Sequence, residues 1–149
     1  MGRRIRLLAY NVRSLWNVGS FFRTCDAFGV EKIYLTGYTG TPPRKEITKT
    51  ALGAEEFVPW ESAKDPIPIL KGLQAEGWHL LALEITPDAV DLGELKAPQN
   101  VCLIVGHELT GVPPEILTLC DQVTKIPMLG KKESLNVAVA AGIALFTIR

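Results

Sequence analysis

Short apolar runs alternate with amphipathic stretches along the whole chain. Several of the runs are apolar at nearly every position, which is typical of parallel strands covered on both faces of a sheet. The predicted strands are residues 5–10, 32–35, 78–85, 101–105 and 123–127. Because these strands alternate with predicted helices, the pattern indicates an α/β fold with a mostly parallel sheet and helices on both faces.

The stretches with helical spacing are residues 18–28, 67–75, 114–119 and 135–148. In the first, apolar side chains recur at helical spacing between Asn17, the predicted N-cap, and Gly29, the predicted stop. The last follows Ser134 as its predicted cap and is apolar on nearly every side, which predicts that it is buried. A loop rich in glycine and proline is predicted at residues 37–45.

The length of 149 residues fits one domain, residues 1–149. The longest apolar run, residues 137–146, is shorter than the ~18 residues of a membrane span, and no cleavage site follows the basic N-terminus. We therefore expect a cytoplasmic protein with no membrane partner. Three well-separated cysteines and two histidines predict neither a disulfide framework nor a metal site.

The balance of 16 Lys+Arg against 16 Asp+Glu hides an uneven distribution of charge. Residues 1–50 carry nine basic and three acidic residues, residues 51–100 carry three basic and nine acidic ones, and the remainder carries four of each. The basic N-terminal third is typical of a surface that faces a polyanion. Charges that mix once the chain folds would explain the same distribution.

Glycines and polar residues follow three of the predicted strands. They are Glu84, Gly106, Glu108, Ser134 and Asn136. Taken singly, each has an ordinary explanation, such as a tight turn at Gly106 or a helix cap at Ser134. The carboxyl ends of parallel strands form the ligand crevice of α/β proteins. Together, these residues therefore predict a crevice with an apolar floor, which suits a purine nucleoside.

Arg23 lies on the predicted helix 18–28, on nearly the opposite side from its apolar stripe. A solvated surface arginine is the ordinary outcome for such a position. The alternative is an arginine that a rigid helix presents to an RNA phosphate or to a reacting hydroxyl. His107 follows Gly106 and is interpreted as a polar loop residue without an assigned role.

Three stretches, in this order, resemble the motifs of one known family. They are residues 11–30 (NVRSLWNVGSFFRTCDAFGV), 103–112 (LIVGHELTGV) and 126–140 (IPMLGKKESLNVAVA). In them the chain is similar to the SpoU (TrmH-type) RNA ribose 2′-O-methyltransferases of the SPOUT superfamily. Residues 49–54 (KTALGA) also look like the small-residue segment found between the first two motifs of that family.

The resemblance implies a sheet whose C-terminal part forms a deep trefoil knot, S-adenosylmethionine as cofactor, and a homodimer. By position, it implies a cofactor cleft lined by Leu83, Glu84, Gly106, Ile126, Met128, Ser134 and Leu135. The catalytic set that it implies is Arg23, Asn17, Glu108, Ser134 and Asn136. Within this set we expect Arg23 to orient the ribose hydroxyl, and Asn17 and Glu108 to hold Arg23 in place. Ser134 and Asn136 would fix the knot loops and the methionine end of the cofactor.

The implied activity is methylation of a ribose 2′-hydroxyl in RNA, with transfer RNA favoured over ribosomal RNA because the chain is close to a bare catalytic domain. RNA contacts are then expected from basic residues of the N-terminal third, namely Arg3, Arg4, Arg6, Arg13, Arg44 and Lys45. Two alternatives stay open. One is a catalytically idle knotted domain that keeps the cofactor pocket and binds RNA or protein, and the other is a flavodoxin-like nucleotide binder.

Overall fold

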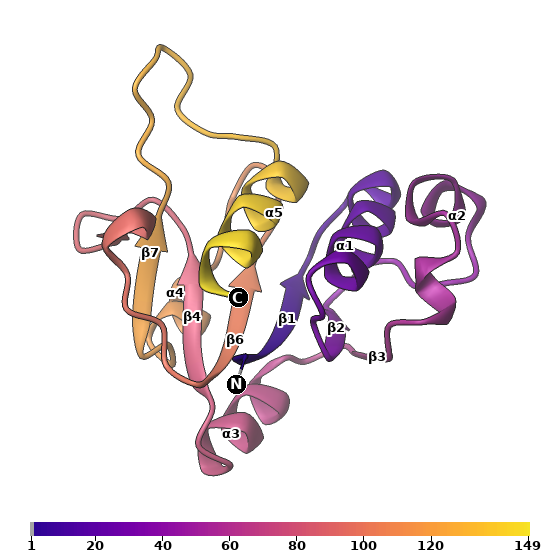
Figure 1. Ribbon diagram of the computed structural model, residues 1–149, viewed down its shortest axis with the longest axis horizontal. Coiled ribbons are helices and arrows are strands. Elements are labelled where there is room, and N and C mark those ends of the chain that lie inside the picture. The colour runs from indigo at the N-terminus through magenta and orange to yellow at the C-terminus, as the bar shows by residue number, and fades with distance from the viewer. Residues whose placement is uncertain (1) are drawn as a thin grey trace.

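Seven strands form one sheet in the computed structural model, which describes residues 2–149 (Figure 1). The strands are β1 (Arg4–Tyr10), β2 (Lys32–Thr36), β3 (Trp60–Ala63), β4 (His79–Leu83), β5 (Val90–Asp91), β6 (Asn100–Val105) and β7 (Gln122–Lys125). Their order across the sheet is β3-β2-β1-β6-β4-β7-β5, and every neighbouring pair is parallel. The predicted α/β fold with a mostly parallel sheet is therefore confirmed.

Parallel pairing brings the carboxyl ends of the strands to one end of the sheet. We call the end where Tyr10, Leu83 and Val105 finish their strands the carboxyl edge. The opposite end, where Arg4 and Lys32 begin theirs, is the amino edge. The segments that carry the three motifs follow β1, β6 and β7, so all three start from the carboxyl edge.

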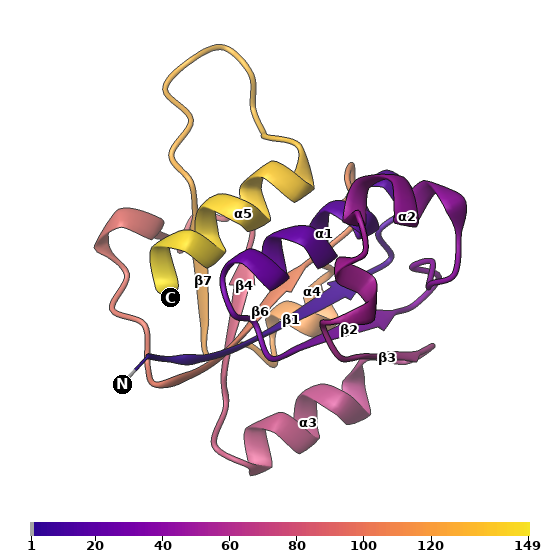
Figure 2. The same ribbon diagram turned by 45° about the vertical axis from the view of Figure 1, so that its right-hand side comes forward.

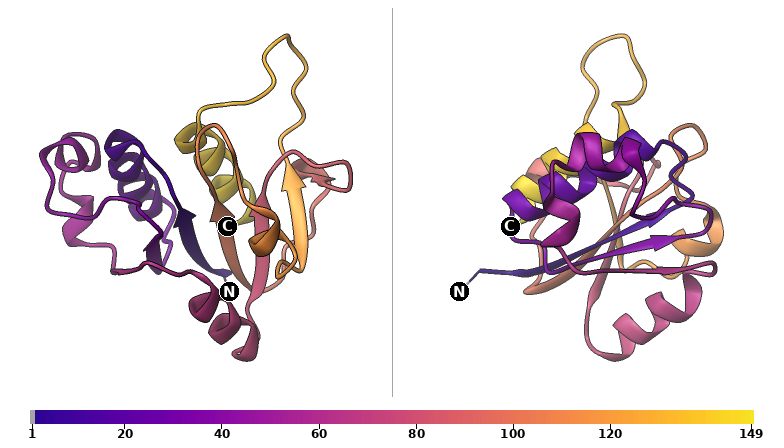
Figure 3. Two further views of the ribbon diagram at one scale, coloured as in Figure 1. Left: turned by 180° about the vertical axis from the view of Figure 1, so that it is seen from behind. Right: turned by 90° about the vertical axis from the view of Figure 1, so that its right-hand side faces the viewer.

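Helices cover both faces of the sheet, as predicted. They are α1 (Leu15–Ala27), α2 (Lys45–Ala51), α3 (Ile67–Ala75), α4 (Pro114–Leu117) and α5 (Val137–Ile148), with the 3₁₀ helices η1 (Ala54–Glu56) and η2 (Leu92–Glu94). Figure 2 and Figure 3 show α1, α2 and α5 on one face and α3 and α4 on the other. The two long helices of the motifs, α1 and α5, thus lie side by side on the same face.

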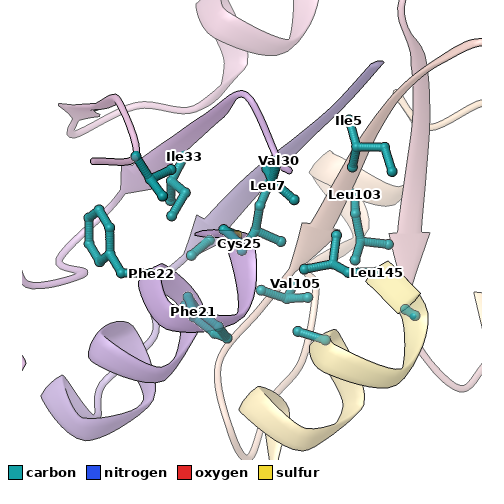
Figure 4. Packing of buried hydrophobic residues seen from close by; sticks show 14 of the residues in the cluster. Ile5, Leu7, Phe21, Phe22, Cys25, Val30, Ile33, Leu103, Val105 and Leu145 are labelled. Carbon is teal, nitrogen blue, oxygen red and sulfur yellow. The ribbon is translucent and has the colours of Figure 1, made fainter. Parts of the chain in front are cut away.

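Residues of the central strands alternate between two apolar cores. On β1, Leu7 packs into the core beneath α1 and α5, whereas Leu8 packs into the core beneath α3 and α4. This alternation follows from the two-residue period of a strand. Figure 4 shows Leu7 and Leu103 of β6 facing Cys25 of α1 and Leu145 of α5. Burial on both faces fixes β1 and β6, and with them the loops at the carboxyl edge.

Helix α1 begins at Leu15 rather than at residue 18, and its N-cap is Ser14, whose hydroxyl accepts a hydrogen bond from the amide of Asn17. The prediction of Asn17 as the cap is wrong because Asn17 lies inside the first turn, where it is buried. The predicted stop is confirmed. Gly29 follows the helix with φ of 68°, a left-handed conformation that costs glycine little.

Helix α5 begins at Val137 with Asn136 as its N-cap, so the predicted start at residue 135 and the predicted Ser134 cap are wrong. The Asn136 side-chain oxygen accepts hydrogen bonds from the amides of Ala138 and Val139. Asparagine caps a helix at least as well as serine does, and here it satisfies two of the amides that the first turn leaves free.

The prediction that α5 is buried on nearly every side is wrong for the single chain. Its buried residues are Ala141, Ala144, Leu145 and Ile148. Its large exposed apolar residues are Val139, Ile143 and Phe146. The exposed side lies next to α1, where the rings of Phe28 and Phe146 meet edge to face with 5.7 Å between their centroids. An apolar stripe therefore runs along α5 at the surface.

The remaining differences concern strand ends and short elements. β4 and β7 stop before the ends predicted for residues 78–85 and 123–127, because the chain there turns into the loops of the carboxyl edge. Predicted helix 67–75 matches α3, whereas α4 is shorter than predicted. Elements that were not predicted are α2, β3, β5, η1 and η2. None of the helices within residues 2–149 is long and apolar enough to cross a membrane.

Candidate active site

A cleft of about 780 Å³, counted to its open mouth, lies at the carboxyl ends of β4, β6 and β7. All seven residues predicted for cofactor binding line it: Leu83, Glu84, Gly106, Ile126, Met128, Ser134 and Leu135. The family resemblance therefore identified residues that line one cleft, although they come from three segments far apart along the chain.

The other lining residues were not predicted to bind the cofactor, although Glu108 was predicted in the catalytic set and His107 was interpreted as a polar loop residue. They are Ile85, Val105, His107, Glu108, Leu109, Thr110, Gly111, Lys125, Val137 and Ala140. Val137 and Ala140 are spaced so that both lie on one side of the first turn of α5. The available signal was their place next to a strand end or a helix start, which many non-lining residues share.

Close backbone packing shapes one wall of the cleft. The segment after β6 folds back on itself, with an antiparallel bridge between His107 and Gly111 and a 2.9 Å hydrogen bond from the Gly111 amide to the His107 carbonyl. A side chain on Gly106 would collide with the backbone carbonyl of Gly111. Gly106 is therefore required for the close approach of these two backbone segments.

Glu84 supports this wall from the end of β4. One of its carboxylate oxygens accepts a 2.8 Å hydrogen bond from the amide of Val112, and the other accepts a 2.9 Å hydrogen bond from the amide of Ile85. A side chain on Gly111 would collide with the same carboxylate. Glu84 thus fixes the loop after β6 while still lining the cleft.

Glu108, Asn17 and Asn136 connect all three motifs by hydrogen bonds. The Glu108 carboxylate accepts from the amides of Arg13 (2.9 Å) and Ser14 (2.8 Å) and from the side-chain amide of Asn17 (3.0 Å). The Asn136 side chain in turn donates to the side-chain oxygen of Asn17 at 3.3 Å. The buried Asn17 therefore joins the start of α1 to the loops that carry the cleft.

The charge of Glu108 is favoured by these contacts. Burial by itself would raise the pKa of Glu108, but the hydrogen bonds donated by the backbone of Arg13 and Ser14 and by Asn17 outweigh it, and the net pKa is lowered below its usual value. The carboxylate is ionised at neutral pH and acts as a fixed acceptor for the start of α1.

Arg23 lies on the exposed side of α1, as its position opposite the apolar stripe predicts. It lines a second, open hollow between α1 and α5, together with Asn17, Asn136 and the apolar stripe of α5. Within residues 2–149 its guanidinium makes no hydrogen bond or ion pair, so the expectation that Asn17 and Glu108 hold Arg23 is wrong. They hold the first turn of α1 instead, because Glu108 is bound by the backbone there.

The structure separates the six basic residues expected to contact RNA. At the amino edge, Arg4 and Arg6 both pair with Glu31, at 2.9 Å and 2.6 Å. Their guanidinium groups also lie over the ring of Trp78, 4.9 Å and 4.4 Å from its centroid. Arg3 donates to the backbone carbonyls of residues 97 and 148.

Arg13, Arg44 and Lys45 lie at the other end of the sheet and are exposed. Arg13 lines a hollow that also includes Glu46 of the first turn of α2 and His107 and Glu108 from the cleft wall. Arg13 therefore lies beside the cleft wall, and Arg44 and Lys45 directly precede Glu46 of the same hollow along the chain. Among residues 2–149, no group of three or more His, Cys, Asp or Glu side chains is placed to hold a metal ion.

Comparison with known proteins gives one family. Residues 4–146 match the SpoU rRNA Methylase family. The tRNA (guanosine(18)-2′-O)-methyltransferase of Aquifex aeolicus is 34% identical over 141 residues, which cover 94% of this chain and 66% of that protein. The chain spans between 53% and 72% of the length of the curated relatives it matches.

Two solved structures add detail. An AdoMet-bound rRNA methyltransferase from Sinorhizobium meliloti has a TM-score of 0.92 and 29% identity, covering 100% of this chain and 57% of that one. A structure described as giving insights into the 2-OH methylation of C/U34 on tRNA has a TM-score of 0.86 and 26% identity, covering 97% of this chain and 93% of that one. Because residues 4–146 match this family, the alternative of a flavodoxin-like nucleotide binder has no support.

Proposed function

The chain belongs to the SpoU rRNA Methylase family, and on that premise we propose that it methylates a ribose 2′-hydroxyl in RNA with S-adenosylmethionine as the methyl donor. The observation that carries this proposal is the hydrogen-bonded chain of Glu108, Asn17 and Asn136, which draws three distant motifs together between the cleft and Arg23. The same chemistry is supported by a relative that is named a tRNA 2′-O-methyltransferase and by a similar rRNA methyltransferase structure with AdoMet bound.

The cleft fits the proposed cofactor by the chemistry of its lining. Leu83, Ile126 and Leu135 offer apolar surface for a purine ring, while the backbone around Gly106 and the exposed hydroxyl of Ser134 offer polar contacts. When bound, S-adenosylmethionine would supply an electrophilic methyl group on a sulfonium. The protein then has to position the accepting oxygen and assist the loss of its proton.

Alignment of the two reacting groups can lower the barrier to such a transfer by ~7–11 kcal/mol. Arg23, presented by a rigid helix, would donate hydrogen bonds to the ribose 2′-oxygen and stabilise its developing negative charge. A guanidinium remains protonated in proteins and is therefore a poor general base. The proton of the 2′-hydroxyl is therefore assigned to water or to an RNA phosphate, with Arg23 holding the oxygen in place.

Transfer RNA is the proposed substrate. The tRNA (guanosine(18)-2′-O)-methyltransferase of Aquifex aeolicus, which is 34% identical to this chain, supports this choice. We assign the phosphate contacts to Arg13, Arg44 and Lys45, which are exposed at the carboxyl edge. Arg3, Arg4 and Arg6 contribute little in this proposal because their guanidinium groups are engaged at the amino edge.

The proposal includes a homodimer joined through the exposed apolar stripe of α5, formed by Val139, Ile143 and Phe146. Exposed apolar patches of this kind mark interaction sites, and this one shares its hollow with Arg23, so a second copy would lie beside the catalytic arginine. Sedimentation analysis should find a dimer, and Ile143→Asp should convert it to a monomer. A wild-type monomer at micromolar concentration would contradict this part of the proposal.

The family resemblance also leads us to propose the trefoil knot, a single domain over residues 1–149, and a cytoplasmic location, where transfer RNA is available. Packing of the helices against one sheet supports the single domain.

Transfer of tritiated methyl groups to bulk small RNA tests the activity directly. Arg23→Ala should lower incorporation by ~10²–10³-fold, the range expected for loss of a donor that stabilises a developing negative charge, without changing the thermal unfolding midpoint. Lys71→Ala, at an exposed position of α3 on the opposite face, is the matched control. Cofactor binding without any methyl transfer by the wild type would favour the catalytically idle knotted domain instead.

A further inference from the structure

Two exposed aromatic side chains lie beside the cleft at the carboxyl edge. Trp16, in the first turn of α1, is 48% exposed and lines the same hollow as Arg13 and His107. Tyr38, in the loop after β2, is 59% exposed, and its ring meets that of His107 edge to face at 6.4 Å between centroids. His107 therefore lies next to Tyr38 and shares a hollow with Trp16 at the cleft wall.

Both aromatic residues are held in place through their backbones. The hydroxyl of Thr50 donates a 2.8 Å hydrogen bond to the carbonyl of Trp16, which ties α1 to α2. The amide of Tyr38 donates a 3.0 Å hydrogen bond to the side-chain oxygen of Asn11. Glu108 further fixes the residues that precede Trp16. Large apolar rings are thus kept at the surface on a rigid base.

Basic side chains accompany the two rings. The Lys49 ammonium lies over the ring of Trp16, 5.9 Å from its centroid. Lys64 lines the hollow that contains Tyr38, and Arg13 lines the one that contains Trp16. Two acidic residues, Glu46 and Glu108, line the Trp16 hollow. The Glu108 carboxylate is bound by the backbone amides of Arg13 and Ser14. Positive charge therefore predominates around the rings.

Resting on the proposed function, we propose that Trp16 and Tyr38 stack against unpaired bases next to the methylated nucleotide, so that the enzyme takes its substrate from a single-stranded RNA loop. Exposed aromatic rings interleaved with basic side chains are the usual means of binding single strands, since every base offers a face for stacking. Paired bases in an RNA helix do not offer that face. The two rings thus select the class of RNA segment, while Arg23 acts on the ribose.

Tryptophan fluorescence gives the direct test, since a base stacked on an exposed tryptophan quenches its emission. A short single-stranded oligoribonucleotide of mixed sequence should quench the wild type. The same oligonucleotide annealed to its complement should not. Trp16→Phe should lose the quenching, because Trp78 is buried and Trp60 lies on the edge strand β3, away from the cleft. Unchanged quenching in Trp16→Phe would overturn the proposal.

Affinity provides the second arm of the test. Trp16→Ala and Tyr38→Ala should each weaken binding of the single strand about tenfold, within the range measured for loss of one stacking side chain. Tyr38→Phe should keep most of the affinity. Phe57→Ala is the matched control, because Phe57 is 74% exposed but lies after η1, outside the hollows of the carboxyl edge. Equal affinity of wild type and both alanine variants would overturn the proposal.

The outcomes separate this proposal from the activity on which it rests. If the wild type methylates RNA and both alanine variants bind and methylate as well as it does, the stacking proposal fails alone. If the oligonucleotide quenches Trp16 but no methyl group is transferred, the proposed activity fails alone. A Trp16→Ala variant that dissociates into monomers with unchanged RNA affinity would show that Trp16 serves a protein interface, and would also overturn the proposal.

Discussion

The two ends of the sheet receive arginines from the same basic third of the chain and use them differently. At the amino edge, Arg4 and Arg6 both form ion pairs with Glu31 and lie over the ring of Trp78, so their guanidinium groups make their contacts within the protein. At the carboxyl edge, the polar contacts of Glu108 go to backbone amides, and the guanidinium groups of nearby arginines remain exposed.

This difference shows why a count of charges along the sequence is a weak guide to a binding surface. Opposite charges that meet at the amino edge neutralise each other, whereas at the carboxyl edge the carboxylate fixes the backbone and leaves the cations free to meet an anion. The amino edge uses its arginines within the fold, whereas under the proposed function the carboxyl edge offers its arginines to RNA. Substitutions at matched positions of the two ends should separate these roles.

The largest effect should come from the cleft wall. In Gly106→Ala, the new methyl group would meet the carbonyl of Gly111 and push the wall aside. Overpacking of this kind costs ~1–3 kcal/mol, so calorimetric titration with S-adenosylhomocysteine should show affinity reduced by about 30-fold. Gly130→Ala, where the added group meets no neighbour, should bind normally. Equal affinities of the two variants would show that the wall is not part of the binding site.

The two glutamates come next. Glu31→Gln and Glu108→Gln should each lower the free energy of unfolding by ~1–2 kcal/mol in urea, because both remove a charged acceptor of several hydrogen bonds. Only Glu108→Gln should also slow methyl transfer, since it loosens the start of α1. If the Glu31→Gln variant is fully folded but loses methyl transfer, the amino edge takes part in function.

The basic residues should differ in how RNA binding responds to salt. Arg13→Ala and Lys45→Ala should each weaken binding a few-fold and reduce the slope of log affinity against log salt by about 1, as expected for the loss of one phosphate contact. Arg4→Ala and Arg6→Ala should leave the slope unchanged. Filter binding of transfer RNA at several salt concentrations measures both quantities. A reduced slope in Arg4→Ala would place RNA at the amino edge as well.

The smallest effect is in the pH dependence of stability. At Glu31, burial would raise the pKa, but hydrogen bonds and attraction from Arg4 and Arg6 outweigh it, so the pKa is lowered, as it is at Glu108. Both carboxylates therefore stabilise the fold above the ordinary glutamate value of about 4.3, and this stability is lost as the pH falls below it through the folded-state values. Urea midpoints from about pH 6 to about pH 3 should fall less steeply in the double Gln variant. Parallel curves for the variant and the wild type would contradict the assignment.

Local pattern was enough for the central elements of the fold. The apolar runs at β1 and β6 and the spacing in α3 predict those elements because packing on both faces or on one stripe leaves a strong periodic signal. β3 escaped prediction because it is an edge strand with exposed polar positions at residues 61 and 62. Helix starts at α1 and α5 were misplaced because several polar residues there could serve as caps, and contacts across the fold decide among them.

The candidate site could be predicted only in part from the sequence, because some of its contacts join residues far apart along the chain. The lining of the cleft follows from motif resemblance, since the motifs keep residues in fixed places after their strands. The partners of Glu108 lie more than 90 positions away along the chain, and the pairing of Arg4 and Arg6 with Glu31 depends on the register of β1 and β2. No local pattern reports contacts of that range.

The central claim is that the carboxyl edge directs a methyl group to a ribose oxygen. Transfer RNA incubated with the protein and isotopically labelled S-adenosylmethionine, digested to nucleosides and analysed by mass spectrometry, tests this most directly. We predict that the wild type places the label on the sugar of one nucleoside and that Arg23→Ala leaves the RNA unlabelled. Label on a base, or equal labelling of the sugar by Arg23→Ala, would contradict the account.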